Sequence, residues 1–311
     1  MNEALRFPSV NPWTPLVGAT LGWGASAVLN RAALLQGVDT MTLVLLRMAF
    51  ALTTLVIYIA ISGRLKSTSA TAWKYGLLLG TLGMAVPMTL MTASLNDLPV
   101  SLGGLLVALV PLSTIAAAHF VVPGERFQVR TLPGLLVALA GSAVLVGIGG
   151  ASAEGIGNLW RGVTFMLCGI VAAGLGGAMS RRLALRVPGR ELVLPQFTVN
   201  TLVLVIVVPV VFGLHVESVH GVSWLLVAAV GVVGTTVAFA SFLVGAGMNP
   251  ASRLALTGYA VPVVAVTLAV TFLGEHLTVS IVTGAVLIIA GVILAERSTN
   301  HIPEPGVATA G

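Results

Sequence analysis

One charged side chain, Arg47, falls well inside an apolar stretch that is long enough to cross a bilayer, residues 40–62. A guanidinium in a bilayer interior costs at least about 2.5–3.5 kcal/mol unless it finds partners or reaches the headgroups. Its planar fork can hold a carboxylate or a phosphate through two parallel hydrogen bonds. Arg47 is therefore a candidate for binding an anionic group of a solute. The competing interpretation is an arginine that bonds helix-end carbonyls or lipid headgroups.

Aromatic and hydroxyl side chains in other apolar stretches could complete such a site. Trp23 is the one tryptophan away from the end of a stretch, and Ser26 follows three residues later. Together they could give a cavity an aromatic wall and a hydroxyl contact, with core packing as the competing interpretation. Threonines in helices often bond their own backbone instead. The remaining candidates for contact with a solute are Thr89, Thr92, Thr235, Thr236 and Tyr259.

Carboxylates are missing from the middle of every apolar stretch, because all ten acidic residues fall in connections or at stretch ends. A small exporter of cationic drugs would keep a proton-exchanging glutamate there, so uncharged or zwitterionic solutes are favoured, and uncoupled facilitation is as open as proton coupling. The five histidines also lie at or beyond stretch ends, and no His-Glu-x-x-His, Gly-x-Ser-Gly or Walker motif occurs. The sequence therefore predicts no metal site, no intramembrane enzyme and no direct use of ATP.

The composition indicates an all-α integral membrane protein. Of 311 residues, 57% are hydrophobic and 8% charged, with a mean hydropathy of +1.05, whereas soluble domains carry about 25% charged residues. The net charge of +5 comes from basic residues scattered singly between apolar runs, which is typical of membrane topology rather than nucleic-acid binding. Ten segments reach the roughly 20 residues that a spanning helix needs: 13–35, 40–62, 73–95, 100–122, 130–150, 160–183, 193–214, 222–246, 251–273 and 278–295.

The second half of the sequence repeats the first at matched landmarks. In each half two prolines lie 12 residues apart, a Gly-Glu pair follows, and two glycines come 9 and 16 residues after the glutamate. A repeat of about half the chain in so apolar a sequence predicts a transporter built from two related halves. We expect repeats at 13–150 and 160–296 and a disordered tail at 297–311. The landmarks are Pro99, Pro111, Glu125, Gly134 and Gly141, then Pro250, Pro262, Glu275, Gly284 and Gly291.

The paired prolines and glutamates have distinct candidate roles. Pro111 and Pro262 fall in mid-segment, where a proline removes a backbone donor and kinks the helix. They are candidate hinges for alternating access, with static kinks needed for packing as the alternative. Glu125 and Glu275 directly follow the fourth and ninth segments, so each is expected to cap the helix that comes next, the fifth or the tenth. A proton-relay role is the alternative for both.

Positive charge predicts the orientation. With the amino terminus in the cytoplasm, 12 of the 15 lysines and arginines fall on the cytoplasmic side, so both termini and the tail are expected there. Asn30 and Arg31 close the first segment and Arg181 and Arg182 close the sixth, and we expect all four at the membrane interface. Because five segments per half is an odd number, the second half must enter the membrane upside down, giving ten transmembrane helices as two inverted five-helix repeats.

These features together resemble the EamA family of the drug/metabolite transporter superfamily. The resemblance covers roughly 13–296 and rests on Trp-Gly-Ala-Ser at 23–26, Arg47, the paired proline and Gly-Glu units and the paired glycines of the fifth helices. It implies a ten-helix fold with a central cavity lined mainly by helices 1, 3, 4, 6, 8 and 9. It also implies export of amino acids, related metabolites or drugs. One departure is an extra residue between Pro111 and Glu125.

The expected function is that of a multi-pass permease of the plasma membrane. It exports small metabolites such as amino acids or drug-like solutes, or facilitates their movement, by alternating access. A nucleotide-sugar or phosphorylated-metabolite antiporter ranks lower, because it would need several basic residues near the cavity and only Arg47 is available. An intramembrane enzyme is a remote third. The expected partners are a small-molecule solute and the lipid bilayer. Protons are a candidate coupling ion, homo-oligomerisation stays open, and neither a cofactor nor nucleic acid is expected.

Overall fold

Helices make up all the regular structure in the described part of the chain. Lipid offers the backbone no hydrogen bonds, so a spanning segment has to satisfy its own N–H and C=O groups, and a helix does this locally. The computed structural model describes residues 11–61, 69–123, 129–149, 158–184, 186–187, 189–248 and 251–299. Six stretches within it are long and apolar enough to cross a membrane: Thr40–Ile61, Ala70–Ser94, Val100–Val121, Leu159–Ser180, Glu191–Phe212 and Ser223–Phe242.

The first half of the chain forms five helical rods, and the third and fourth of these change helix type along their length. Both ends of each rod lie within about one helical turn of the ends of its predicted segment. The elements are α1 (Trp13–Leu35), α2 (Thr40–Ile61), α3 (Ala70–Gly80), η1 (Thr81–Ala85), α4 (Val86–Ser94), α5 (Val100–Leu106), η2 (Val107–Leu109), α6 (Val110–Val121), η3 (Val129–Thr131) and α7 (Leu132–Gly149).

The second half forms five more rods in the same order. The last rod continues to Thr299, so the first residues of the predicted tail are helical, and the rest of that tail lies outside the described residues. The elements are α8 (Leu159–Ala184), α9 (Gly189–Val207), η5 (Val208–Phe212), η6 (Val216–Ser218), α10 (Ser223–Gly231), η7 (Val232–Val237), α11 (Ala238–Met248), α12 (Ala251–Leu273) and α13 (Val279–Thr299).

A π-helical segment interrupts the third rod of each half at the same position. η1 begins at Thr81 and η7 at Val232, 151 residues later, which is also the offset between the paired prolines. A π segment widens the helix locally, re-aims the side chains around it and is frequent at functional sites. In the second half this segment carries two of the candidate residues, Thr235 and Thr236.

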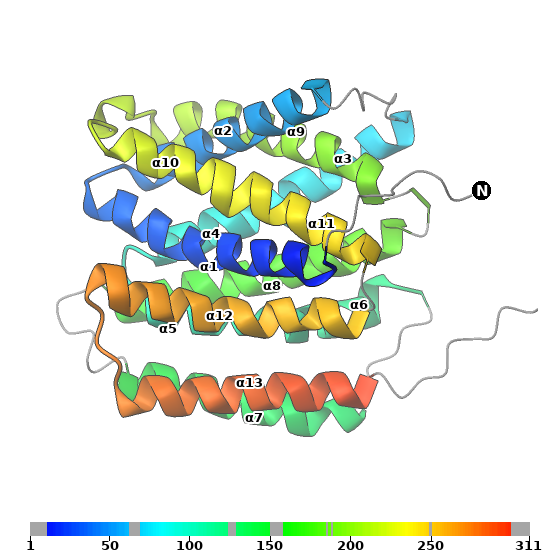
Figure 1. Cartoon of the computed structure of the whole chain (residues 1–311), viewed down its shortest axis with the longest axis vertical. Coiled ribbons are helices and arrows are strands. Elements are labelled where there is room, and N and C mark those ends of the chain that lie inside the picture. Colours follow the sequence, from blue (N-terminus) through cyan, green and yellow to red (C-terminus); the bar gives the residue numbers. More distant parts are fainter. Residues whose placement is uncertain are drawn as a thin grey trace, which may run out of the picture.

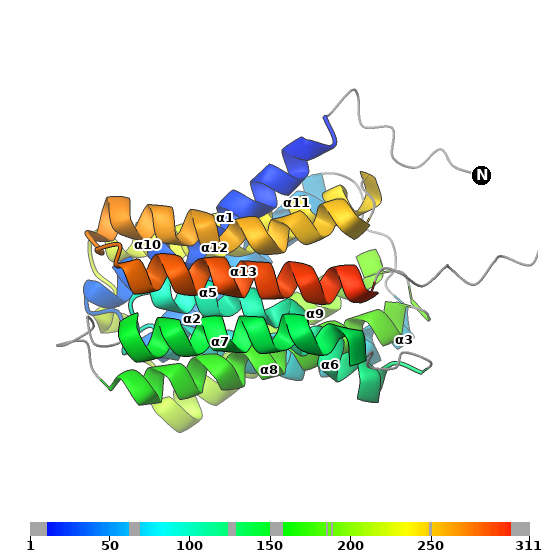
Figure 2. The same ribbon diagram turned by 90° about the horizontal axis from the view of Figure 1, so that it is seen from below.

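The fifth rods, α7 and α13, lie side by side at one edge of the molecule (Figures 1 and 2). A Cβ atom placed on Gly141 would come within 2.9 Å of Gly284 O, and one placed on Gly291 would come within 2.5 Å of Gly134 O. These crossed contacts require the two rods to run antiparallel, packed through small residues. The predicted fold of two inverted five-helix repeats is confirmed.

The rods run between two loop faces. The Glu275 face, on the left of Figure 1, holds the connections 36–39, 95–99, 213–222 and 274–278. The opposite end, named here the Arg182 face, holds the amino-terminal end of α1. Across the molecule, α2, α3 and α9 form one edge and the α7–α13 pair the other. Between them α1 packs against α12, α11 and η7, so the first rod touches mainly elements of the second half.

Candidate solute-binding site

Three polar side chains from three elements meet around Arg47, deep between the two halves. Arg47 Nη1 donates to Asn30 Oδ1 at 3.3 Å and to Thr92 Oγ1 at 3.4 Å, and Nη2 donates to Thr235 Oγ1 at 3.2 Å. All four residues are buried, and Arg47 is 5% exposed. We call these residues, contributed by α1, α2, α4 and η7, the Arg47 node.

Two of the three acceptors of the node are oriented by a second hydrogen bond. Asn30 Nδ2 donates to Ser26 O at 2.7 Å, one turn back on α1, which leaves Asn30 Oδ1 for the guanidinium. Thr235 Oγ1 donates to Val230 O at 3.0 Å, five residues back, as the π-helical turn of η7 allows. Both oxygens are therefore oriented to accept from Arg47. Arg47 itself lies seven residues, or about 10 Å, from the start of α2.

The node holds a positive charge without a matching negative one. Its three hydrogen bonds are 3.2–3.4 Å long and end on neutral oxygens, and Arg47 Nε is buried without a partner. Among the described residues, the Asp97–Arg161 ion pair lies at the Glu275 face instead, as does the contact of Glu217 with His215, which is an ion pair only when the histidine is protonated. A buried cation with only neutral partners is poorly compensated. The arrangement can therefore accept an anionic group.

The other predicted contact residues surround the node without joining it. Trp23 is half-buried on α1, with its ring centre 5.1 Å from that of Phe242 at an interplanar angle of 47°. Ser26 is buried and supports Asn30. Thr236 donates to Ala51 O at 2.8 Å and so ties η7 to α2. Thr89 lies half-buried on α4, three residues before Thr92 of the node.

The predicted hinges lie in mid-rod. Pro111 stands at the start of α6, directly after the 3-10 segment η2, and Pro262 lies inside α12. Tyr259 also belongs to α12, but its side chain lies outside the described part. Glu125 lies outside the described residues altogether.

Glu275 caps a different helix from the expected one. Its Oε1 accepts from Val100 N at 2.6 Å and its Oε2 from Ser101 N at 2.8 Å, so the carboxylate binds the start of α5 in the other half. The expectation that it caps the tenth helix is therefore wrong. At α13, Thr278 Oγ1 accepts from Ile281 N at 3.3 Å instead. The start of α5 lies beside α12 and offers unpaired N–H groups, which attract a carboxylate.

Asn30 is the residue of the Arg47 node that sequence reasoning missed. It was expected at the membrane interface, yet it is 4% exposed and belongs to the node. A signal was present, because Trp23, Ser26 and Asn30 follow one another at spacings of three and four residues and so share one face of α1. Arg31, its neighbour, does lie at the Glu275 face, where it donates to the carbonyls of Leu95 and Asn96.

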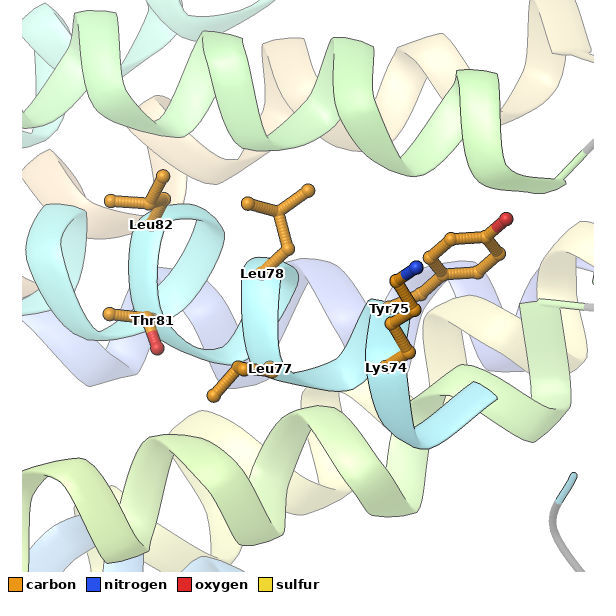
Figure 3. A pocket seen from close by; sticks show the side chains of 6 residues that line it. All are labelled: Lys74, Tyr75, Leu77, Leu78, Thr81 and Leu82. Carbon is orange, nitrogen blue, oxygen red and sulfur yellow. The ribbon is translucent and has the colours of Figure 1, made fainter. Parts of the chain in front are cut away.

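A surface groove of about 480 Å³ runs along α3 and η1, away from the node (Figure 3). Apart from Lys74, Tyr75 and Thr81 its lining is leucine, and no residue of the Arg47 node contributes to it. Such an apolar groove on the outer side of a membrane rod suits lipid chains better than a polar solute.

Comparison with known proteins identifies the family. The EamA-like transporter family matches residues 15–147 and 160–297, one match in each half. The chain belongs to this family. It is a multi-pass membrane transporter of a small solute, and the resemblance found in the sequence is confirmed.

Two curated relatives cover most of the chain. "Uncharacterized transporter YvbV" of Bacillus subtilis (strain 168) is 28% identical over 245 residues, which cover 76% of this chain and 74% of that protein. "Probable terminal-alkyne amino-acid exporter" of Streptantibioticus cattleyicolor is 28% identical over 229 residues, which cover 71% and 72%. A protein of known crystal structure matches with a TM-score of 0.63 at 23% identity and covers 92% of this chain and 99% of its own, which shows the fold alone.

Proposed function

We propose that this EamA transporter exports amino acids or closely related zwitterionic metabolites across the plasma membrane by alternating access, and that Arg47 binds the solute carboxylate. One observation carries the proposal: a buried guanidinium with three neutral partners and an Nε atom that has none. A carboxylate would supply the missing negative charge. The name of the Streptantibioticus relative, an amino-acid exporter, supports the same solute class.

The node favours a carboxylate over a phosphate. A phosphorylated metabolite carries about two negative charges near neutral pH, and Arg47 is the one cation in the node, whose other members are an amide and two hydroxyls. One guanidinium matches one carboxylate in charge and in bidentate geometry. The phosphorylated-metabolite antiporter therefore stays the second candidate.

The two prolines support a hinge at the contact between halves. A Cβ atom placed on Gly258 of α12 would lie 3.8 Å from Pro111 Cγ, so the proline of one half lies beside the rod that contains Pro262 in the other. A proline in mid-rod leaves a carbonyl without its helical donor and weakens the rod locally. We propose that α6 and α12 bend at these positions, and that the Glu275 face is extracellular, as the distribution of basic residues favours.

Transport by purified protein in liposomes tests the proposal. A panel of labelled amino acids, their decarboxylated amines and phosphorylated metabolites is offered with and without a pH gradient. We expect flux of amino acids, none of the amines, and a large loss of affinity in Arg47→Gln. Arg47→Lys keeps the charge but not the fork, so it should recover only part of the affinity. Arg182→Gln is the matched control, because it removes one exposed cation at the opposite face.

Three outcomes decide between the candidates. Equal flux of the amines and the amino acids, or unchanged affinity in Arg47→Gln, would contradict carboxylate binding at Arg47. Transport confined to phosphorylated solutes would establish the second candidate. A solute flux that is the same with and without the pH gradient would identify a facilitator. A flux that the gradient increases would identify protons as the coupling ion.

A further inference from the structure

Glu275 joins the two halves at the face that bears its name. The carboxylate lies in the α12–α13 connection of the second half, and the amides that it binds, Val100 N and Ser101 N, open α5 in the first half. Gly274 makes this possible, because its φ of 67° ends α12 in a conformation that a residue with a side chain rarely adopts. Bonds of 2.6 and 2.8 Å from two amides to one carboxylate are short and charge-assisted.

A second charged link joins the halves at the α4–α5 connection, directly before the amides that Glu275 binds. Arg161 of α8 holds Asp97 through two hydrogen bonds of 2.7 Å each, to Oδ1 and to Oδ2. Asp97 Oδ1 also accepts from Asn158 N at 2.9 Å. The Asp97 side chain is 2% exposed and that of Arg161 is 58% exposed, so the carboxylate lies against the protein and the guanidinium covers it from the solvent side.

Arg31 binds the connection from the remaining side. It reaches from the end of α1 to the carbonyls of Leu95 and Asn96, at the end of α4. Residues 95–101, which comprise the short link between α4 and α5 and the first two residues of α5, are therefore held by three charged side chains from three separate elements. We call these side chains, Arg31, Arg161 and Glu275, together with Asp97, the latch.

An apolar layer lies directly under the latch. Val28, Leu95, Val100 and Ala269 form one buried cluster, contributed by α1, the α4–α5 link, α5 and α12. Leu95 and Val100 also belong to the segment that the latch holds. The layer and the latch thus close the same end of the molecule, one with apolar side chains and the other with charges.

The latch and the Arg47 node share two rods at adjacent positions. On α1, Asn30 bonds Arg47 and the next residue, Arg31, bonds the end of α4. On α4, Thr92 bonds Arg47, and the carbonyl of Leu95, three residues later, accepts from Arg31. A change at the node that moves α1 against α4 must therefore strain the latch.

We propose that the latch closes the Glu275 face over the Arg47 node and has to open for a solute to pass between this face and the node. Glu275 and Arg161 belong to the second half and their partners to the first, so a motion that separates the two halves at this face has to break both links. The proposal rests on the proposed role of the Arg47 node in solute binding, but not on which solute is bound.

Cysteine accessibility tests the latch in the full-length transporter. The one native cysteine, Cys168, is replaced by serine, and Val28→Cys places a reporter in the apolar layer, where residue 28 is 7% exposed. A membrane-impermeant maleimide is applied to each face in turn in the absence of solute. Glu275→Ala should raise the labelling rate from the Glu275 face by about 5- to 30-fold, the population shift expected for the loss of one helix cap.

Further variants keep the test decisive. Glu275→Asp should restore slow labelling in part, because the shorter carboxylate can still reach one amide. Glu217→Gln is the matched control, since Glu217 is an exposed carboxylate on the same face outside the latch, and it should label like the parent. Should Glu275→Ala fail to fold, Asp97→Asn, which breaks the second link, carries the same expectation. Parental labelling rates in folded Glu275→Ala and Asp97→Asn, or faster labelling from the Arg182 face alone, would overturn the proposal.

Discussion

Gly80 and Gly231 lie in equivalent helix–helix contacts in the two halves of the transporter. A Cβ atom on Gly231, at the end of α10, would strike Arg47 O of α2, and one on Gly80, at the end of α3, would strike Gln196 O of α9. The π-helical segments η7 and η1 begin at the next residue in each half. The position that carries Arg47 in the first half thus carries Gln196 in the second.

This relationship separates packing from solute binding. Gly231→Ala and Gly80→Ala both force a methyl group into a helix contact, so each should lower the free energy of unfolding by about 1–3 kcal/mol. Gly231→Ala alone displaces the backbone of Arg47 and should also raise the KM for solute. Thermal unfolding and liposome transport measured on both variants check this. Equal changes in KM would show that the shift at Arg47 has no specific effect.

Neighbouring threonines of η7 should have separable effects. Thr235→Val removes an acceptor from Arg47 and should weaken solute affinity by about fivefold, the equivalent of one hydrogen bond of about 1 kcal/mol. Thr236→Val removes the bond to Ala51 O, which joins two rods, and should lower stability with little effect on affinity. Solute-binding titrations and melting curves of the two variants give the comparison. Identical behaviour of the two would contradict the assignment of Thr235 to the node.

Asn200 should be replaceable with a gain in stability. It is completely buried in α9, and both amide atoms of its side chain lack a hydrogen-bond partner. Such a group costs about 1–3 kcal/mol, so Asn200→Leu, similar in volume, should raise the free energy of unfolding by about 1–2 kcal/mol and leave transport intact. Asn30→Leu is the control, because that amide is fully used and its loss should lower solute affinity. Loss of transport in Asn200→Leu would instead mean that Asn200 binds the solute or a required water.

The ion pair between Asp97 and Arg161 should make stability fall in acid. The hydrogen bonds from Arg161 hold the pKa of Asp97 below its ordinary value, and the amide of Asn158 adds to this against the effect of burial. A depressed folded-state pKa means that the stabilisation is complete above about pH 4, the ordinary carboxyl value, and is lost as the pH falls through the lower folded-state value. Melting temperatures of the parent between pH 7 and pH 3 should therefore drop more steeply than those of Asp97→Asn. Parallel curves would count against the pair.

The rods and their inversion could be predicted because they depend on local composition. Apolar length marks the spans, and the glycines at 134, 141, 284 and 291 mark the α7–α13 contact, since small residues let helices approach closely. The partners of Arg47 could not be predicted, because they come from α1, α4 and η7 and meet only once the rods have packed. For the same reason, proximity in sequence predicts that Glu275 caps α13, whereas the helix that it does cap, α5, is near only in space. The widened turns at η1 and η7 have no residue signature that reveals them in advance.

Glu275 belongs to the second half and caps α5 of the first, so the first half does not complete this helix end by itself. Two separate five-helix chains would have to lie in opposite membrane orientations to make the same contact. Joining two such chains in one gene fixes the opposite orientations in every molecule. It also frees the two halves to diverge, so that one half carries Arg47 and the other carries Gln196 at the matched position.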